Sequence, residues 1–461
     1  MECSIPRIVI AATKSSSGKT TVVTGLLSAL RQRGIKVQPY KVGPDYIDPG
    51  YHRLASGQVS HNLDSWLMSK ETMRDVFISS ASEADLAVVE GVMGLYDGGN
   101  NGISSTAEIA QLLAAPVVLV IDCKSMGASA AALALGFREY DPSLPLAGVI
   151  LNRLGSDNHE RIIREAMDKV GIPVLGAVRR NDLYKMPERH LGLLPTEENK
   201  ELDFLDRLGR EIAQQVDIDA IIRIARQTAP MQLASERAVQ AGSPKVKIGI
   251  ARDEAFSFYY PESIRVLQNK GAEIVEFSPL SDAKLPEVDG LILGGGFPEM
   301  FGEKLSANQS LRTDIKEKAQ QGMPIYGECG GFMYLTESLT DFSGRIYPMC
   351  GILPGGVKMN NKLQMVGYVT AELLNDSLLG RKGDRIKGHE FHFSTETAAE
   401  DLSKRAFKFT RSRNGEEYYG GYCWKKVLGS YLHMHFAGHP EAAECFINQC
   451  LEYKNNKKEK D

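Results

Sequence analysis

The feature that most constrains the fold is a regular alternation of short apolar runs with amphipathic helical patterns in the first part of the chain. The apolar runs occupy residues 7–12, 85–90, 117–122, 146–152 and 172–177. Between the first two runs, residues 20–33 place several apolar side chains on one helical face and end before Gly34. This alternation is typical of a mostly parallel sheet that is covered by helices on both faces.

The alternation stops once and then resumes, which predicts two α/β domains. Between residues 196 and 244 the strand pattern is replaced by a charged helical pattern, which ends in an Ala/Gln/Ser-rich stretch before Pro244. A chain of 461 residues is also too long for one hydrophobic core. We expect a first domain over 1–195, a helical connector and linker over 196–244, a second domain over 245–453 and a disordered tail over 454–461.

Composition and charge exclude several classes of partner. Lys and Arg together number 54 against 58 Asp and Glu, so the net charge of −4 creates no basic field for nucleic acid or anionic lipid. No stretch approaches the roughly 20 apolar residues of a membrane span, and no targeting signal is evident. The seven cysteines form no CxxC pair, which favours a reducing cytoplasm over a disulfide framework or a structural zinc site.

A phosphate-binding loop follows the first apolar run. The sequence TKSSSGKTT begins at Thr13 and leads into a helix, as in a P-loop whose first glycine is replaced by threonine. Lys19 would reach the outer phosphates of ATP, and the Thr20 hydroxyl would ligate Mg²⁺. Lys14 stands where some dimeric ATPases carry a second lysine, which is weak support for a homodimer. The predicted nucleotide-binding residues of the loop are Ser17, Gly18, Lys19, Thr20 and Thr21.

Acidic residues follow two other predicted strands at the same edge of the sheet. One strand ends in Glu90, and the glycine-rich sequence EGVMGLYDG carries the chain on to Asp97. The sequence KVGPDYIDP supplies Asp45 and Asp48, either of which alone could be a turn residue beside proline. Together, the acidic residues Glu90, Asp97 and the Asp45/Asp48 pair beside a P-loop favour metal binding. We predict Thr20, Glu90 and Asp45 as metal ligands, and Asp45, Asp48 and Asp97 as residues beside the nucleotide.

The second domain carries a candidate nucleophile. A predicted strand over 324–326 leads into GECGGF and a helical pattern, so Cys329 lies on a glycine-flanked elbow between strand and helix. The sequence SYLHMHF near the end of the domain offers His433 as the base that the cysteine needs. A third glycine loop, GGGFPE from Gly294, could offer backbone amides to an oxyanion.

These motifs resemble one family. The modified P-loop with KVGPDYIDP and EGVMGLYDG resembles the N-terminal domain of cobyrinate a,c-diamide synthases, which is related to dethiobiotin synthetase. GGGFPE, GECGGFMYL and SYLHMHF resemble the class I (triad) glutamine amidotransferase domain of the same family. The resemblance implies a ligase that uses ATP, Mg²⁺ and L-glutamine to amidate the a- and c-acetate carboxylates of cobyrinate through an acyl phosphate, in cobalamin biosynthesis.

The resemblance also implies roles for single residues. Cys329 would be the nucleophile and His433 the residue that activates it, while Lys19 and Thr20 would serve ATP and Mg²⁺. One position departs from the class I pattern, because its acid, two residues after the histidine, is replaced by His435. We therefore expect a Cys–His dyad without an orienting carboxylate, which should work more slowly than a triad.

Two alternatives stay open at this stage. The same chemistry could act on another tetrapyrrole polycarboxylate, either hydrogenobyrinate or the nickel-sirohydrochlorin of the coenzyme F430 pathway. A different class of function is a non-catalytic ATP-dependent switch, in which the P-loop domain would dimerise through Lys14. The nucleophile elbow at Cys329 argues against a switch.

Overall fold

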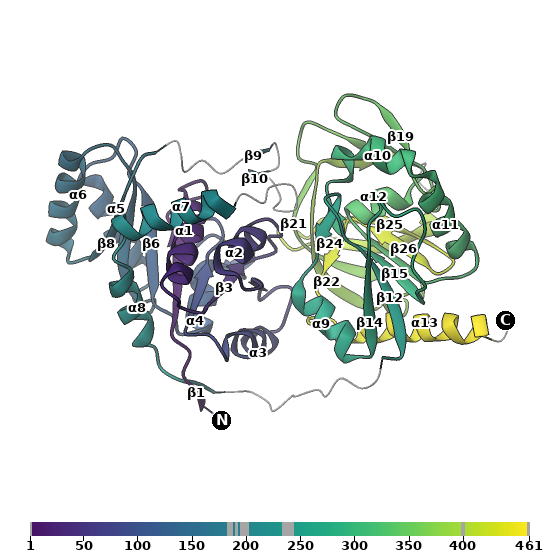
Figure 1. Ribbon diagram of the computed structural model, residues 1–461, viewed down its shortest axis with the longest axis horizontal. Helices are drawn as coiled ribbons and strands as arrows, with labels where there is room; N and C mark the ends of the chain where they lie inside the picture. Colours follow the sequence, from purple (N-terminus) through teal and green to yellow (C-terminus); the bar gives the residue numbers. More distant parts are fainter. Residues whose placement is uncertain are drawn as a thin grey trace. The chain divides into compact units, whose positions relative to one another are not determined.

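The computed structural model describes residues 2–181, 188–189, 192–193, 202–232, 244–397 and 402–458. The chain divides into two compact units, one formed by residues 1–65 and 69–236 and the other by residues 66–68 and 237–461. Across the described ranges, no helix is both long enough and apolar enough to cross a membrane. Each unit is described by itself below (Figure 1).

The first unit is built on a seven-stranded sheet with the order β4-β3-β5-β2-β6-β7-β8. Every neighbouring pair in it is parallel, as predicted. Its central strands are buried along their whole length, which explains why they read as continuous apolar runs. The strands are β2 (Arg7–Ala12), β3 (Val37–Val42), β4 (His61–Leu63), β5 (Leu86–Glu90), β6 (Val117–Asp122), β7 (Leu146–Leu154) and β8 (Val174–Arg179).

Helices cover this sheet, and three of them share one core with it. Val22 of α1, Ile212 of α7 and Ile221 of α8 belong to the same buried cluster as Ile8 and Val120 of the strands. The two helices of the predicted connector, α7 and α8, therefore pack onto the first unit. Residues 194–201 and 233–243 lie outside the described residues. The helices are α1 (Lys19–Gln32), α2 (Asp48–Ser56), α3 (Lys70–Ala81), α4 (Thr106–Leu112), α5 (Ser129–Tyr140), α6 (Asp157–Val170), α7 (Leu202–Gln215) and α8 (Ile218–Arg226).

The second unit contains a ten-stranded mixed sheet with the order β14-β12-β15-β17-β26-β25-β24-β21-β22-β27. The pairs from β14 to β26 are parallel, and the pairs from β26 to β27 are antiparallel. The strands are β12 (Val246–Ala251), β14 (Ala272–Phe277), β15 (Gly290–Leu293), β17 (Ile325–Glu328), β21 (Met365–Leu373), β22 (Arg385–His392), β24 (Arg405–Arg411), β25 (Glu417–Trp424), β26 (Val427–Ser430) and β27 (His433–Met434).

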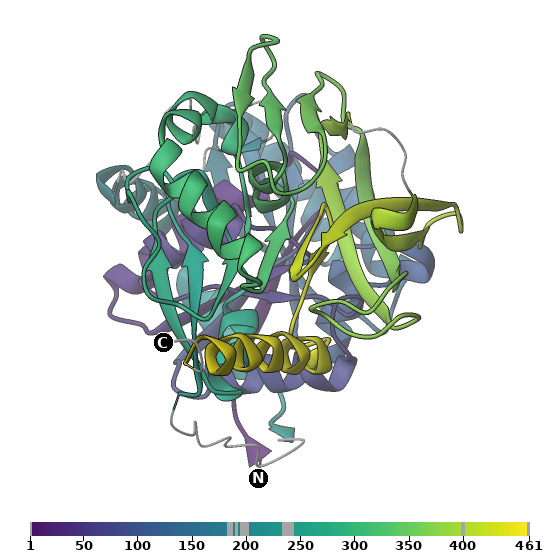
Figure 2. The same cartoon turned by 90° about the vertical axis from the view of Figure 1, so that its right-hand side faces the viewer.

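The antiparallel half of this sheet curls back on itself. Only Tyr431 and Leu432 separate β26 from β27, although four strands lie between them in the sheet order. The far edge of the sheet must therefore return to the end of β26. Figure 2 shows the strands of this half wrapping around the side of the unit. As a result, residues at the end of β26 and on β27 lie near the carboxyl end of β17.

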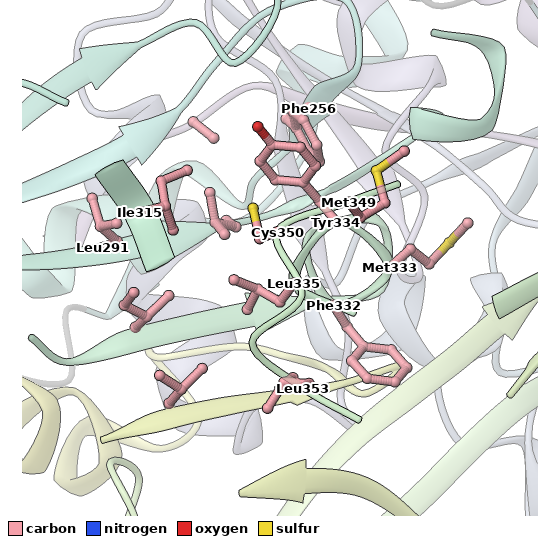
Figure 3. Packing of buried hydrophobic residues seen from close by; sticks show 14 of the residues in the cluster. Phe256, Leu291, Ile315, Phe332, Met333, Tyr334, Leu335, Met349, Cys350 and Leu353 are labelled. Atoms are coloured by element: carbon pink, nitrogen blue, oxygen red, sulfur yellow. The ribbon is translucent and has the colours of Figure 1, made fainter. Parts of the chain in front are cut away.

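Helices and two smaller sheets complete the second unit. The helices are α9 (Pro261–Asn269), α10 (Gly302–Ala307), α11 (Gln309–Gln320), α12 (Gly330–Leu335) and α13 (Pro440–Lys458). The smaller sheets are formed by β13 (Phe256–Phe258) with β16 (Gly295–Gly296), and by β18 (Ser338–Thr340), β19 (Ile346–Pro348), β20 (Gly356–Met359) and β23 (Ser394–Glu396). The short helix α12 is buried throughout, and Figure 3 shows Phe332, Met333, Tyr334 and Leu335 packed among Phe256, Met349 and Leu353.

The prediction of a disordered tail over 454–461 is wrong for residues 454–458, because α13 continues to Lys458. Lys454 is held at the surface, where its ammonium donates to the Lys245 carbonyl at 2.7 Å and lies 3.7 Å from the Asp289 carboxylate. A run of lysines can extend a helix when their long stems reach partners on the body of the protein. Residues 459–461 lie outside the described residues.

Candidate active sites

The phosphate-binding loop joins β2 to α1, as predicted. Gly18 has a left-handed backbone (φ 79°), and a Cβ at this position would lie 2.4 Å from the Asn152 amide nitrogen. That amide group donates to the Ser17 carbonyl at 2.8 Å, and the Ser17 hydroxyl donates to the Lys14 carbonyl at 2.9 Å. Only glycine fits at position 18. Asn152 was not predicted as a site residue, although it lies near the carboxyl end of β7 at the same edge of the sheet.

Lys19 points from the first turn of α1 toward the loop after β5, and Thr20 toward the end of β5 and the start of α2. The Lys19 ammonium donates to the Met93 carbonyl at 3.1 Å, and burial, together with the nearby Lys41 charge, lowers the pKa of Lys19 to about 8. The Thr20 hydroxyl donates to Glu90 Oε1 at 2.7 Å and lies 3.3 Å from Asp48 Oδ2. The structure thus brings the predicted residues Thr20, Glu90 and Asp48 together.

Two residues that sequence reasoning missed complete this cluster. The Lys41 ammonium, on β3, contacts Asp48 Oδ2 at 2.5 Å and Glu90 Oε1 at 3.0 Å, and it lies 3.9 Å from Asp45 Oδ2. His52 Nε2, on α2, lies 2.7 Å from Glu90 Oε2. The sequence could have indicated Lys41, because a lysine inside an otherwise uncharged buried strand needs a charged partner. His52 follows Asp48 by one helical turn and so shares its face.

The charges in the cluster shift one another. Burial would raise the pKa of Glu90, but Lys41 and His52 hold it well below its usual range. Burial and the neighbouring Asp45 carboxylate raise the pKa of Asp48 to about 8, against the pull of Lys41. The pKa of Lys41 is raised by Asp48 and Glu90, although burial alone would lower it. Three carboxylates therefore surround one buried ammonium group.

The other two predicted aspartates shape loops. Asp45 Oδ1 accepts hydrogen bonds from the Ile47 amide at 2.8 Å and the Asp48 amide at 3.0 Å, at the start of α2. Asp97 Oδ2 accepts a hydrogen bond from the Gly94 amide at 3.0 Å and so closes the glycine-rich loop after β5. Within the described ranges, His, Cys, Asp and Glu side chains nowhere gather in a group of three that could hold a metal ion by themselves.

The strand–elbow–helix predicted around Cys329 is present in the second unit. Cys329 lies between β17 and α12 with φ 46° and ψ −102°, a strained conformation for a side chain other than glycine. A Cβ at Gly331 would lie 2.0 Å from the Leu293 carbonyl oxygen, so the helix approaches β15 too closely for any other residue. The glycines therefore let the elbow seat Cys329 beside the GGGFPE loop.

His433 reaches the same loop. A Cβ at Gly295 would lie 2.7 Å from His433 Cε1, and one at Gly330 would lie 3.0 Å from the Gly296 amide nitrogen. Burial lowers the pKa of His433 to about 3, so its imidazole is neutral and able to accept a proton. Burial and the nearby Glu299 carboxylate raise the pKa of the Cys329 thiol, which therefore needs a base to form a thiolate.

The expected oxyanion loop is partly engaged in other contacts. The Gly294 amide donates to the Tyr259 hydroxyl at 2.8 Å, and the Phe297 amide donates to the Ala255 carbonyl at 3.0 Å. These two amides are used to fold the loop. Hydrogen bonding by the Gly330 amide, at the start of α12, offsets part of the rise in the pKa of the Cys329 thiol.

Comparison with known proteins supplies the family. Residues 8–194 match the CobQ/CobB/MinD/ParA nucleotide binding domain, and residues 247–441 match the CobB/CobQ-like glutamine amidotransferase domain. A cobyrinate a,c-diamide synthase of Dehalococcoides mccartyi is 46% identical over 456 residues, which cover 96% of this chain and 97% of that protein. The chain belongs to the cobyrinate a,c-diamide synthase family.

Other members of the family also match over nearly the whole chain. A cobyrinate a,c-diamide synthase of Picrophilus torridus is 42% identical, with 97% of this chain and 99% of that protein covered. A hydrogenobyrinate a,c-diamide synthase of Streptomyces coelicolor is also 42% identical, with 97% and 98% covered. These matches confirm the predicted resemblance, the fold class of a P-loop domain followed by a class I amidotransferase-like domain, and a ligase rather than a non-catalytic switch.

Proposed function

We propose that this chain uses ATP and glutamine to amidate the a- and c-acetate carboxylates of cobyrinate, giving cobyrinate a,c-diamide in cobalamin biosynthesis. The observation that carries the proposal is the presence of both halves of the chemistry in one chain. One unit gathers Lys19 and Thr20 of a P-loop with Glu90, and the other places Cys329 on an elbow that shares a loop with His433. The chain also matches cobyrinate a,c-diamide synthases over nearly its whole length.

The second unit would release ammonia from glutamine. Cys329 Sγ attacks the side-chain carbonyl carbon, while His433 takes the thiol proton and delivers it to the leaving nitrogen. The carbon–nitrogen bond breaks, ammonia departs and a thioester to Cys329 remains. Water then hydrolyses this thioester to glutamate. The neutral, buried His433 suits both proton transfers, since one of its two ring nitrogens is unprotonated and can take up the thiol proton before passing it on.

The first unit would activate the substrate. A carboxylate oxygen of the acceptor attacks the γ-phosphorus of ATP, the bond to the β-phosphate oxygen breaks, and an acyl phosphate and ADP result. Lys19 must exchange the Met93 carbonyl for a phosphate oxygen to neutralise the developing charge. Ammonia then attacks the acyl carbon and phosphate leaves.

Mg²⁺ fits the same cluster. The Thr20 hydroxyl contacts both Glu90 and Asp48, which gathers hard oxygen ligands, and three carboxylates there share one ammonium group. We infer that Thr20 and Glu90 hold the ion with Asp45, as predicted from the sequence, or with Asp48, which lies closer to Thr20. A site with few protein ligands is usual for Mg²⁺, which keeps waters and phosphate oxygens. Bound there, the ion would supply charge neutralisation at the phosphates.

The identity of the tetrapyrrole is the finer part of the proposal. The relative named for hydrogenobyrinate, at 42% identity, makes hydrogenobyrinate the second candidate. The decisive experiment incubates the purified protein with ATP, Mg²⁺ and glutamine, and with cobyrinate, hydrogenobyrinate or nickel-sirohydrochlorin in turn. We expect the diamide of cobyrinate to form fastest. Faster amidation of either other compound would reassign the substrate, and no product from any of them would refute the proposal.

The remaining expectations on partners follow from this function. The small-molecule partners are ATP, L-glutamine and a tetrapyrrole polycarboxylate, and a biosynthetic enzyme of this kind would work in the cytoplasm. A homodimer stays a prediction that rests on Lys14 alone; its measure is the mass in solution of the wild type and of a Lys14→Ala variant.

A further inference from the structure

A buried carboxylate lies beside the histidine base, although the acid of the class I pattern is missing. Glu328 Oε2 is 3.8 Å from His433 Nδ1. Glu328 is the last residue of β17 and directly precedes Cys329. The position where the class I acid would stand is His435, whose ring stacks on Tyr260 at 4.7 Å and accepts a hydrogen bond from the Ala437 amide. His435 is therefore engaged elsewhere.

Other contacts fix the orientation of Glu328. Its Oε1 atom accepts a hydrogen bond from the Tyr326 hydroxyl at 2.8 Å and lies 3.4 Å from the Met434 amide nitrogen. Both contacts hold the Oε1 atom, so the Oε2 atom is directed toward His433. Glu328 and His433 are both buried, so water screens their interaction little.

We propose that Glu328 is the positioning acid of the glutaminase, which accepts the Nδ1 proton of His433 and so turns the lone pair of Nε2 toward Cys329. The inference rests on the proposed glutaminase function. At 3.8 Å the two atoms are beyond hydrogen-bond length, so the proposal requires the distance to shorten when glutamine binds. Catalytic hydrogen bonds commonly tighten in this way in substrate complexes. The dyad expected from the sequence thereby becomes a triad whose acid comes from the nucleophile's own strand.

Glu390 is a natural comparison. It is buried like Glu328, and burial raises the pKa of each carboxyl to about 7. His389 pairs with His433 across β22 and β27, with the two rings 4.9 Å apart. Since alternate residues of a strand face opposite sides, Glu390 does not share the face of His389, and it accepts a hydrogen bond from the Tyr418 hydroxyl instead. Its charge, like that of Glu328, raises the pKa of the Cys329 thiol, so it matches Glu328 in everything but the approach to His433. Glu390→Gln is therefore the matched control.

The test measures glutamine hydrolysis by variants of these two residues. Glu328→Gln keeps an oxygen for Tyr326 and Met434, but its amide NH₂ group would donate to Nδ1 and turn His433 into the wrong tautomer. We expect kcat to fall by about 100-fold or more with KM changed less than about threefold. Glu328→Asp keeps the charge, and its kcat should be at least about tenfold higher than that of Glu328→Gln. The kcat of Glu390→Gln should stay within about threefold of the wild-type value.

A spectroscopic readout separates positioning from mere support of the fold. The readout is ¹⁵N NMR of the His433 ring in Cys329→Ala protein with bound glutamine, and the His433 signals are assigned by their loss in His433→Gln. We expect the ring proton on Nδ1. Adding Glu328→Gln should move the proton to Nε2. A proton already on Nε2 with Glu328 present overturns the proposal, as does a folded Glu328→Gln with near-normal kcat or an Asp variant no better than Gln. If the wild type hydrolyses no glutamine but the tautomer still switches, the proposed function fails and the positioning role stands.

Discussion

Replacing Lys41 with methionine should reveal how much of the first unit's stability depends on one buried charge. Lys41 is only 3% exposed, and Asp48 and Glu90, which it contacts, are 8% and 0% exposed. Methionine keeps the apolar stem and removes only the ammonium. The variant leaves these carboxylates without the ammonium, with Thr20 and His52 as hydrogen-bonding neighbours. The charges of Lys19 and Asp45 stay nearby.

The expected loss follows from the burial of the group. Removing one partner of a buried ion pair costs about 3–5 kcal/mol, because the other charge stays buried without compensation. For a unit of this size each kcal/mol shifts the melting temperature by about 2–4 °C, so the first unit should melt about 6–20 °C lower. Mg²⁺ with a non-hydrolysable ATP analogue should stabilise the variant more than the wild type, since a divalent cation supplies the missing charge.

Calorimetry of the full chain measures both effects, with the transition of the first unit identified by its response to the ATP analogue. Lys36→Met is the matched control, because Lys36 is 45% exposed and its ion pair with Glu83 lies at the surface. Surface pairs are worth about 0–1 kcal/mol, so this control should shift the transition by less than about 4 °C. A Lys41→Met protein that melts with the wild type, or that gains nothing extra from Mg²⁺ and the analogue, would refute the reasoning.

Further predictions concern catalysis. Cys329→Ala should abolish glutamine-dependent amidation but leave ammonia-dependent amidation largely intact; equal loss with ammonium salts would mean that the cysteine is structural. Lys19→Ala and Glu90→Ala should each lose orders of magnitude in rate with both nitrogen sources, since a transition-state contact to phosphate or metal disappears; near-normal turnover with ammonia would remove that residue from the site. Gly331→Ala should lower glutaminase activity by about 100-fold, because its Cβ would lie 2.0 Å from the Leu293 carbonyl oxygen and about 1 Å of displacement is enough for such a loss; an active, unshifted variant would show that α12 moves freely. With limiting enzyme and excess cobyrinate, free monoamide should accumulate before diamide, because one P-loop activates one carboxylate at a time; direct appearance of diamide would contradict release between the two steps.

Sequence reasoning predicted the parts of the fold that local pattern determines. The strands β2 and β6 have the predicted limits, and the P-loop and the cysteine elbow stand where glycine, lysine and cysteine at fixed spacing placed them. The tail was misjudged because lysine charge suggested solvation, whereas Lys454 reaches partners on the body of the protein.

The missed residues of the candidate sites depend on contacts between distant segments. Lys41 and His52 acquire their role only when β3 and α2 meet Glu90 of β5. Glu328 escaped notice because the class I pattern directs attention to the residues after the histidine. The curled sheet brings Glu328 close to His433, and the hydrophobic periodicity of the sequence does not predict that curl.

That curled sheet has a consequence for how the protein is made. Cys329 leaves the ribosome well before His433, and between them lie the strands β21, β22, β24 and β25 on which the pairing of β27 depends. Domains emerge and fold from the N-terminus, and pairings distant in sequence form late. A nascent or truncated second unit would therefore hold the thiol without the imidazole. The second unit can hydrolyse glutamine only after β27 has been synthesised and has paired with β22.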